Sequence, residues 1–304
     1  MANVYNKKLI VILGPTASGK TKLALKLAKK FKGEIVSADS RQIYKEMNIG
    51  TAKPTKKETK SIPYYLIDVI SPNEDFNVAL YKKLAVEKII NIQKKGKIPF
   101  LVGGTGLYIS SITDNISFPV VTPDKKLRKN LEKKTAMELF KIYKKSDPEG
   151  SKLIDKNNKR RLVRAIEVCK TTGKSFWQQR EKQKPIFDVL KIGIKIKKEE
   201  LKKRIKKRTD AMFKSGLEKE VKKLYKKYCF LPVFHTIGYQ EFKEYFEGKT
   251  NREETKKLIE LHTLQFAKRQ MTWFKQSKKI LWIKNREEAE KLIKNFLRQK
   301  KSQP

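Results

Sequence analysis

The sequence predicts an α/β fold in which helices flank a parallel sheet, together with a basic, all-helical insertion. Strand-like apolar runs alternate with amphipathic segments over the first hundred residues, a pattern typical of parallel sheets. Strand signals disappear after about Ser117 and return at Leu190. Between them, residues 117–188 carry 20 Lys and Arg but only 9 Asp and Glu. We therefore expect residues 1–116 and 189–304 to form the core domain, and 117–188 the insertion.

The core begins with a predicted strand over residues 9–13, a glycine-rich motif and a helix. Apolar residues at i, i+3, i+4 and i+7, from Ala24 to Phe31, indicate the helix. This context identifies the motif as a P-loop, whose backbone N–H groups surround phosphate, and predicts a P-loop NTPase-like core. We expect Lys20 to meet the terminal phosphates and the Thr21 hydroxyl to bind Mg²⁺. The predicted di- or triphosphate-binding residues are Gly14, Pro15, Thr16, Ala17, Ser18, Gly19, Lys20 and Thr21.

The rest of the core follows in chain order. Three further strands are predicted at residues 34–37, 64–69 and 98–102. One long helix is predicted at about residues 78–95. Three polar turns (the P-loop, Asp39-Ser40 and Gly103 to Thr105) directly follow strands. In doubly wound sheets, the carboxyl ends of the strands are where ligands bind. We therefore expect a ligand site at that edge.

The insertion and the C-terminal part are predicted to be mainly helical. Residues 124–145 and 159–172 predict two helices in the insertion. A strand is expected over residues 190–196, and from Glu199 onward the chain reads as mostly helical. Residues 300–304 are expected to be frayed.

The charge balance indicates a polyanionic partner. The formal net charge is +41, from 73 basic and 32 acidic residues. Only 12 of the basic residues are Arg, which indicates a bias toward Lys, but such a bias does not explain the scarcity of acidic residues. Nucleic acid is favoured over an anionic membrane.

The remaining composition favours a cytoplasmic protein. Cys169 and Cys229 lie far apart without a CxxC motif, so neither a disulfide framework nor a structural zinc site is expected. The first residues do not resemble a signal peptide. No apolar run approaches the roughly 20 residues that span a bilayer.

Three residues at strand ends are candidates for chemistry, and each also has a structural interpretation. Asp39 could be a general base or metal contact, or a cap; Ser40 and Gln42 add polar groups beside it. Thr105 could hydrogen-bond a substrate or cap the following helix. Asp68 ends an apolar run and could be a Walker B carboxylate. Because a proline and two tyrosines interrupt that apolar run, a structural role is favoured.

Two basic segments are candidates for RNA contact. Arg160, Arg161 and Arg164 form the densest arginine group, and Arg forks bind phosphate in a way that Lys cannot. The alternative is a solvated helix face. Residues 267–275 interleave cations with aromatics, which suits stacking on single-stranded RNA. Trp273, taken alone, fits the core better.

Seven segments, taken together and in order, make the sequence resemble the tRNA dimethylallyltransferases, the tRNA isopentenyltransferase family. They are residues 14–21, 37–44, 47–54, 101–108, 161–168, 237–239 and 267–273. His235 and Gln240, which flank Ile237-Gly238-Tyr239, depart from the family pattern. The C-terminal zinc finger of eukaryotic members is absent, which indicates a bacterial-type enzyme.

The resemblance implies transfer of a dimethylallyl group from dimethylallyl diphosphate to N6 of adenosine 37, in tRNAs that read codons starting with U. It implies diphosphate binding by the P-loop, Mg²⁺ as cofactor, Asp39 as general base, and Thr105 at the reacting region. We expect a monomer. The implied tRNA contacts are Asp39, Ser40, Arg41, Gln42, Thr105, Arg128, Arg160, Arg161, Leu162, Val163, Arg164, Lys268, Arg269, Gln270, Met271, Thr272, Trp273, Phe274 and Lys275.

Other functions remain open at this point. An adenylate isopentenyltransferase acting on free AMP or ATP would be expected to have a smaller or less basic insertion. A P-loop nucleotide kinase would be expected to carry a set of arginines in a lid, and it would not need a net charge of +41. A non-catalytic RNA-binding protein would leave the intact P-loop unexplained.

Overall fold

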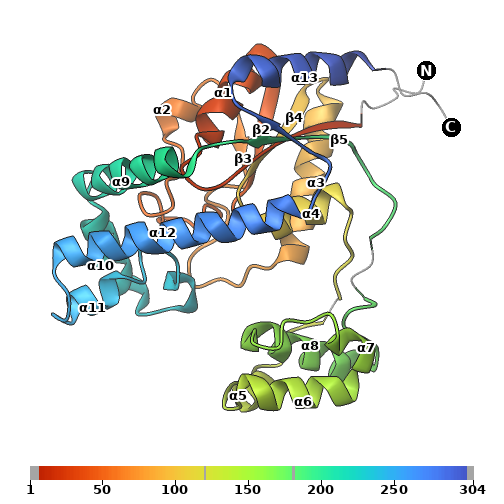
Figure 1. Cartoon of the computed structure of the whole chain (residues 1–304), viewed down its shortest axis with the longest axis vertical. Coiled ribbons are helices and arrows are strands. Elements are labelled where there is room, and N and C mark those ends of the chain that lie inside the picture. Colours follow the sequence, from red (N-terminus) through yellow and green to blue (C-terminus); the bar gives the residue numbers. More distant parts are fainter. Residues whose placement is uncertain (1–6, 120, 180–181, 300–304) are drawn as a thin grey trace. The chain divides into compact units, whose positions relative to one another are not determined.

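The computed structural model describes residues 7–119, 121–179 and 182–299. The chain divides into two compact units (Figure 1). Unit 1 comprises Met1–Thr113 and Ile186–Pro304, and unit 2 comprises Asp114–Pro185. Residues 300–304, which were expected to be frayed, lie outside the described residues.

Unit 1 contains a six-stranded sheet whose neighbouring strands are all parallel. The strand order is β3-β2-β4-β1-β5-β6. Leu13 of β1 pairs with Gly103 of β4, which pairs with Ala38 of β2, so three strands end at one level. The strands are β1 Lys8–Leu13, β2 Gly33–Ala38, β3 Tyr64–Tyr65, β4 Ile98–Gly103, β5 Asp188–Ile194 and β6 Ile280–Ile283.

Helices cover both faces of this sheet because alternate residues of each central strand are apolar and point to opposite sides. Leu9 and Leu13 of β1 pack with α3 and α4, whereas Ile10 and Ile12 pack with α1 and α13. The helices of unit 1 are α1 Lys20–Lys30, α2 Lys56–Thr59, α3 Val78–Lys94, α4 Gly106–Thr113, α9 Lys198–Lys214, α10 Leu217–Tyr228, α11 Phe242–Phe246, α12 Arg252–Lys275 and α13 Arg286–Arg298, with a short 3₁₀ helix at Pro232–Phe234.

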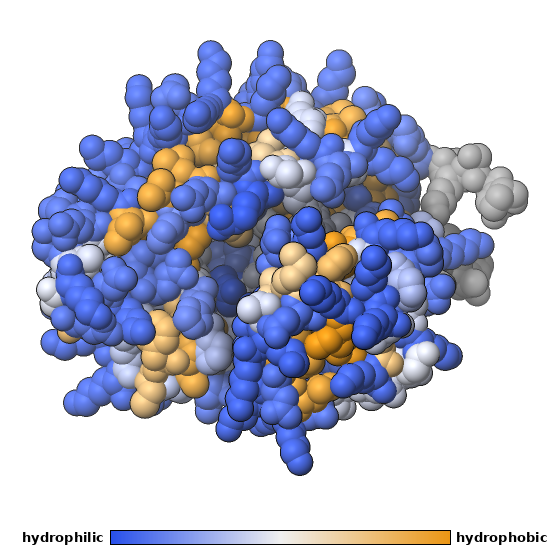
Figure 2. Space-filling model, turned by 60° about the horizontal axis from the view of Figure 1, so that its bottom comes forward, coloured by the Kyte–Doolittle hydropathy of each residue, from blue (hydrophilic) through white to orange (hydrophobic). Residues whose placement is uncertain are grey.

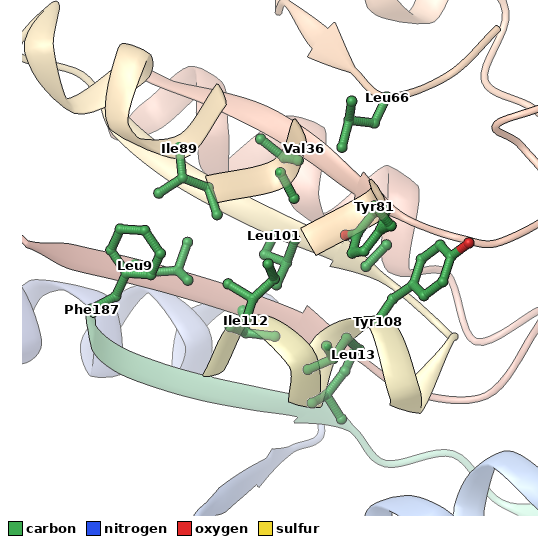
Figure 3. Packing of buried hydrophobic residues seen from close by; sticks show 14 of the residues in the cluster. Leu9, Leu13, Val36, Leu66, Tyr81, Ile89, Leu101, Tyr108, Ile112 and Phe187 are labelled. Atoms are coloured by element: carbon green, nitrogen blue, oxygen red, sulfur yellow. The ribbon is translucent and has the colours of Figure 1, made fainter. Parts of the chain in front are cut away.

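Two tyrosines connect the apolar core, on the face of the sheet that α3 and α4 cover, to the carboxyl end of a strand (Figure 3). The rings of Tyr81 and Tyr108 stack with centroids 3.8 Å apart. The Tyr81 hydroxyl donates a hydrogen bond of 2.9 Å to the carbonyl of Ser37. This packing fixes the carboxyl end of β2, from which Asp39 emerges.

Unit 2 is helical, with α5 Lys125–Glu132, α6 Ala136–Ser146, α7 Pro148–Ser151 and α8 Lys159–Thr172 around one apolar core. The predicted helix over residues 159–172 is confirmed with the same bounds. The single helix predicted over residues 124–145 is wrong. Thr135 and Glu138 form a capping box that starts α6 separately, which sequence reasoning overlooked.

Three strand predictions in unit 1 need correction. The strand expected over residues 64–69 ends at Tyr65, because Leu66 and Asp68 adopt φ of 61° and 53°, outside the extended region. The strand expected over residues 190–196 lies two residues earlier, where it pairs with β1. β6 was not predicted at all.

Charged and polar side chains dominate the molecular surface. Hydrophilic residues cover most of the face shown in Figure 2, and charged residues make up 35% of the chain. Within the part of the chain that the structure describes, no helix combines the length and the apolar character needed to cross a membrane.

Candidate active site

The P-loop connects β1 to α1 as the sequence predicted. Gly19 adopts φ of 92°, a conformation that glycine tolerates best, and α1 begins at the next residue. The amine of Lys20 donates a 2.7 Å hydrogen bond to the carbonyl of Pro15, across the loop. Burial lowers the pKa of Lys20 to about 8, although the carboxylate of Asp39 acts in the opposite direction.

A cavity of about 330 Å³ opens beside this loop. Lys20, Thr21, Asp39 and Tyr64 contribute to its wall. The cavity therefore combines the P-loop with Thr21 and Asp39, the side chains predicted as possible metal contacts.

Two arginines of α9 complete the basic side of this cavity. Arg204 donates through Nη1 to the carbonyl of Ser18, at 3.1 Å. Arg208 lines the cavity, and its buried Nε has no hydrogen-bond partner among the described residues. Burial lowers the pKa of Arg208, and the Asp39 carboxylate counteracts this. A buried, incompletely satisfied guanidinium is costly unless an anion occupies the cavity.

Sequence reasoning missed both of these arginines. Arg204 and Arg208 are four residues apart on one helix face, in a chain that otherwise prefers Lys. This spacing is the sequence signal that could have marked them.

Asp39 makes the turn hydrogen bonds expected of a structural residue, and it also keeps one carboxylate oxygen that could take part in chemistry. Its Oδ1 accepts hydrogen bonds from the backbone N–H groups of Arg41 (2.9 Å) and Gln42 (3.4 Å). Within the described part of the chain, Oδ2 has no hydrogen-bond partner. The turn thus holds the carboxylate in place while one oxygen stays available.

A second cavity, of about 370 Å³, shares Asp39 and Arg208 with the first. Thr105 lines it, and its Oγ1 accepts a 3.0 Å hydrogen bond from the backbone N–H of Ser40. Its wall also includes apolar side chains such as Phe266 of α12. Asp39 therefore stands where a basic cavity meets a more apolar one.

The loop that borders both cavities is held by a carboxylate from α10. Glu220 accepts hydrogen bonds from the backbone N–H groups of residues 48–50, at 2.9 to 3.2 Å, and from the hydroxyl of Tyr239, at 2.8 Å. The Tyr239 ring lies so close to Gly50 that a Cβ there would be 2.4 Å from it. This contact gives a physical reason for two of the family-like segments, residues 47–54 and 237–239.

In unit 1, the residues predicted to contact tRNA separate into two groups. Lys268, Arg269, Thr272, Trp273 and Lys275 are exposed on α12, and Met271, Ser40 and Arg41 are half-buried. Trp273 is 41% exposed, so it is not a core residue. Gln42, Gln270 and Phe274 are buried, so their predicted tRNA contacts gain no support from the structure and stay predictions.

In unit 2 too, the residues predicted to contact tRNA differ in how far they are exposed. Arg160 is exposed, and the Arg161 guanidinium lies 5.0 Å from the centre of the Trp177 ring. Leu162 and Val163 lie in the core of the unit, so their predicted tRNA contacts gain no support from the structure and stay predictions.

Two further predicted arginines already have an acidic partner. Arg128 binds Glu167 through Nε and Nη2, at 2.8 and 2.7 Å, and Arg164 binds the same carboxylate through Nη1. Glu167 is completely buried, whereas both arginine side chains are about one-third exposed.

The other acidic candidate has a structural role. Asp68 forms a 2.6 Å ion pair with Lys53, whose amine also binds the carbonyl of Tyr44 and the side chain of Asn48. This network fixes the loop ahead of α2. Among the described residues, no group of three or more His, Cys, Asp or Glu could hold a metal ion.

The P-loop after β1 and the strand order define an α/β protein of the P-loop class, with a basic cavity beside the loop. Comparison with known proteins identifies the family: the IPP transferase model matches residues 42–277, and the chain belongs to that family. The predicted resemblance, the fold class and the assignment as a prenyltransferase are confirmed.

Similar proteins cover almost the whole chain. A tRNA dimethylallyltransferase of Acetivibrio thermocellus is 43% identical over 95% of this chain and 96% of its own length. One from Microcystis aeruginosa is 46% identical over 90% and 87%. The crystal structure of a full-length tRNA isopentenylpyrophosphate transferase from Bacillus halodurans aligns with a TM-score of 0.72 at 35% identity, covering 96% of this chain and 95% of its own. A eukaryotic dimethylallyltransferase acting on tRNA aligns with a TM-score of 0.79 at 28% identity, over 95% and 77%.

Proposed function

We propose that this protein transfers the dimethylallyl group of dimethylallyl diphosphate to N6 of adenosine 37 in tRNAs that read codons starting with U. The observation that carries the proposal is the position of Asp39 at the junction of two cavities. One cavity offers the P-loop, Lys20 and Arg208 to a diphosphate. The other offers Thr105 and apolar walls to a base.

The reaction needs few protein groups. The bond between the allylic carbon and the diphosphate oxygen breaks, and a bond from that carbon to N6 forms. Oδ2 of Asp39 takes the proton that the amine loses. The N–H groups of the P-loop, Lys20 and Arg208 stabilise the negative charge that grows on the leaving diphosphate. The adenine has to leave the anticodon-loop stack to enter the second cavity.

The site fits Mg²⁺, which we propose as the cofactor. Thr21, the first residue after Lys20 in α1, lines the diphosphate cavity. A site with few protein ligands suits Mg²⁺, which commonly keeps waters and binds substrate phosphates. When bound, the ion would help neutralise the leaving diphosphate.

The tRNA contacts that the structure supports are the exposed ones. On α12 these are Lys268, Arg269, Thr272, Trp273 and Lys275. In unit 2 this is Arg160, and the half-buried Arg161 can contribute together with Arg128 and Arg164 through the parts of their side chains that remain exposed. A tRNA substrate also places the enzyme in the cytoplasm, where we expect it to act as a monomer.

An acceptor competition tests the proposal. Radiolabelled dimethylallyl diphosphate is offered together with unmodified tRNA, AMP and ATP, in the presence of Mg²⁺. We expect label in tRNA alone, at the adenosine next to the anticodon. Label in AMP or ATP would identify an adenylate isopentenyltransferase and overturn the proposal.

A further inference from the structure

One buried side chain of α12 joins the two loops that carry the chemistry. Gln270 is only 7% exposed. Its Oε1 accepts a 2.8 Å hydrogen bond from the backbone N–H of Thr16, in the P-loop. Its Nε2 donates a 2.9 Å hydrogen bond to the carbonyl of Gly104, in the turn after β4. A primary amide is suited to this place because it offers an acceptor and a donor side by side.

The turn after β4 leaves room for α12 at two points. A Cβ on Gly104 would lie 2.2 Å from Nε2 of Gln270, so a larger residue there would push the amide away. Three residues further along α12, Trp273 covers Gly106 with equal closeness. The approach of α12 to this turn therefore depends on glycine at both positions.

The two bonded loops are those that must be aligned for transfer. Thr16 lines both cavities. Gly104 immediately precedes Thr105, whose hydroxyl holds the backbone of Ser40, the residue after Asp39. The Gln270 amide is thus linked on one side to the diphosphate loop and on the other to the segment that supports the carboxylate.

We propose that Gln270 is a positioning residue, which sets the separation between the diphosphate loop and the Asp39–Thr105 segment. Both of its hydrogen bonds are internal, so it acts on the reaction without touching either substrate. This inference rests on the proposed function, and it replaces the tRNA contact that the sequence predicted for this residue.

The sharpest test is Gln270→Glu, which keeps the size of the side chain and the acceptor for Thr16. At pH 8 the carboxylate cannot donate to Gly104, so two oxygens face each other. We expect the single-turnover rate at saturating substrates to fall by roughly 10- to 100-fold, the scale of a misplaced reacting group. The dissociation constants for tRNA and diphosphate should stay within about threefold of the wild type, since neither ligand touches the residue.

A pH profile separates positioning from a general loss of structure. Burial, with one oxygen facing the Gly104 carbonyl, raises the pKa of the carboxyl, and its protonated form can again donate to Gly104. The deficit of Gln270→Glu relative to the wild type should therefore shrink as the pH falls from 8 to 6. Gln270→Met, which removes both bonds, should show a deficit that does not change with pH. Gln265→Glu, at an exposed position of the same helix, adds the same charge and should keep the wild-type rate.

Two results would overturn the inference. One is weaker tRNA binding by Gln270→Glu with an unchanged transfer rate on bound tRNA, which would make Gln270 a tRNA contact after all. The other is a deficit in both Gln270 variants that is equal and independent of pH, which would indicate a purely structural role. Should Gln270→Glu fail to fold, a wild-type transfer rate in Gln270→Met would by itself contradict the inference. Absence of transfer by the wild-type enzyme would instead count against the proposed function.

Discussion

Arg164 of α8, in unit 2, and Arg208 of α9, in unit 1, look alike in sequence, but they differ in the partners they already have. Arg164 of α8 shares the buried carboxylate of Glu167 with Arg128. Arg208 of α9 has a buried Nε without any partner among the described residues. A cluster of arginines therefore does not by itself mark the site of anion binding, whereas hydrogen-bonding capacity left unused inside a cavity does.

The electrostatics of the two regions differ in the same way. Burial raises the pKa of Glu167, but hydrogen bonds from Arg128 and Arg164 outweigh it and hold that pKa below its usual value. Around the P-loop, burial lowers the pKa of both Lys20 and Arg208, and the Asp39 carboxylate acts against this at each of them. In the first region, the carboxylate of Glu167 already offsets the charges of the two arginines. Around the P-loop the positive charges are less fully offset, so a bound anion would stabilise this region more.

The largest effect is expected from Asp39→Asn. The amide oxygen can still accept the bonds from Arg41 and Gln42, so the turn should persist, but the proton acceptor is lost. We expect single-turnover transfer to fall by roughly 10²- to 10⁴-fold, while tRNA binding stays nearly unchanged. A variant that retains more than about half of the wild-type rate would show that Asp39 is not the base.

Arg208→Ala tests the comparison between α9 and α8 directly. Loss of one preorganised donor to the leaving group should lower turnover by roughly 10²- to 10³-fold, and Arg208→Lys should recover only part of it, because the fork is lost. Arg164→Ala, the matched change in α8, should leave the affinity for inorganic diphosphate unaltered. Titration of both variants with diphosphate checks this, and equal effects would refute the comparison.

The pKa of Lys20 predicts a pH dependence of diphosphate binding. With a pKa of about 8 in the free enzyme, the amine is protonated below that pH and loses its charge as the pH rises through it. The affinity for inorganic diphosphate, taken relative to that of Lys20→Arg, should therefore be constant up to about pH 7 and then fall, approaching tenfold per pH unit above the pKa. Lys20→Arg stays charged, so its own curve follows only the titration of the ligand and serves as the reference. Calorimetric titration over pH 6.5 to 10 measures the difference, and parallel curves would contradict it.

The smallest effect concerns two arginines of α8, the exposed Arg160 and the half-buried Arg161. Replacing Arg160 and Arg161 by Ala should weaken tRNA binding and reduce the slope of log affinity against log salt by about one unit per lost phosphate contact. Replacing both by Lys should restore the slope but not all of the affinity. If the Ala variant binds tRNA like the wild type at every salt concentration, these arginines are only a solvated surface.

Local sequence signals predicted those parts of the site that each lie directly after the end of a single strand. The P-loop, Asp39 and Thr105 all follow strands whose carboxyl ends the register aligns. The bounds of α8 were also predictable, because Asn158 caps its start and Gly173, at φ of 65°, ends it.

What could not be predicted depends on tertiary contacts. β6 has four residues and is defined by its pairing with β5, not by any period of its own. The roles of Arg208 and Gln270 depend on how α9 and α12 pack against the P-loop. The segments 160–164 and 268–275 each include positions on the buried face of a helix, such as Val163 and Phe274, and the exposure of single positions depends on the same packing.

The central claim, that the P-loop holds a leaving diphosphate and not a nucleotide to be hydrolysed, is tested most directly by product stoichiometry. Inorganic diphosphate and prenylated tRNA are quantified in one reaction with dimethylallyl diphosphate, tRNA and Mg²⁺, and orthophosphate is followed in a parallel reaction with ATP. We predict one diphosphate per modified tRNA and no orthophosphate from ATP. ATP hydrolysis stimulated by tRNA, or tRNA modification without equimolar diphosphate, would contradict this account.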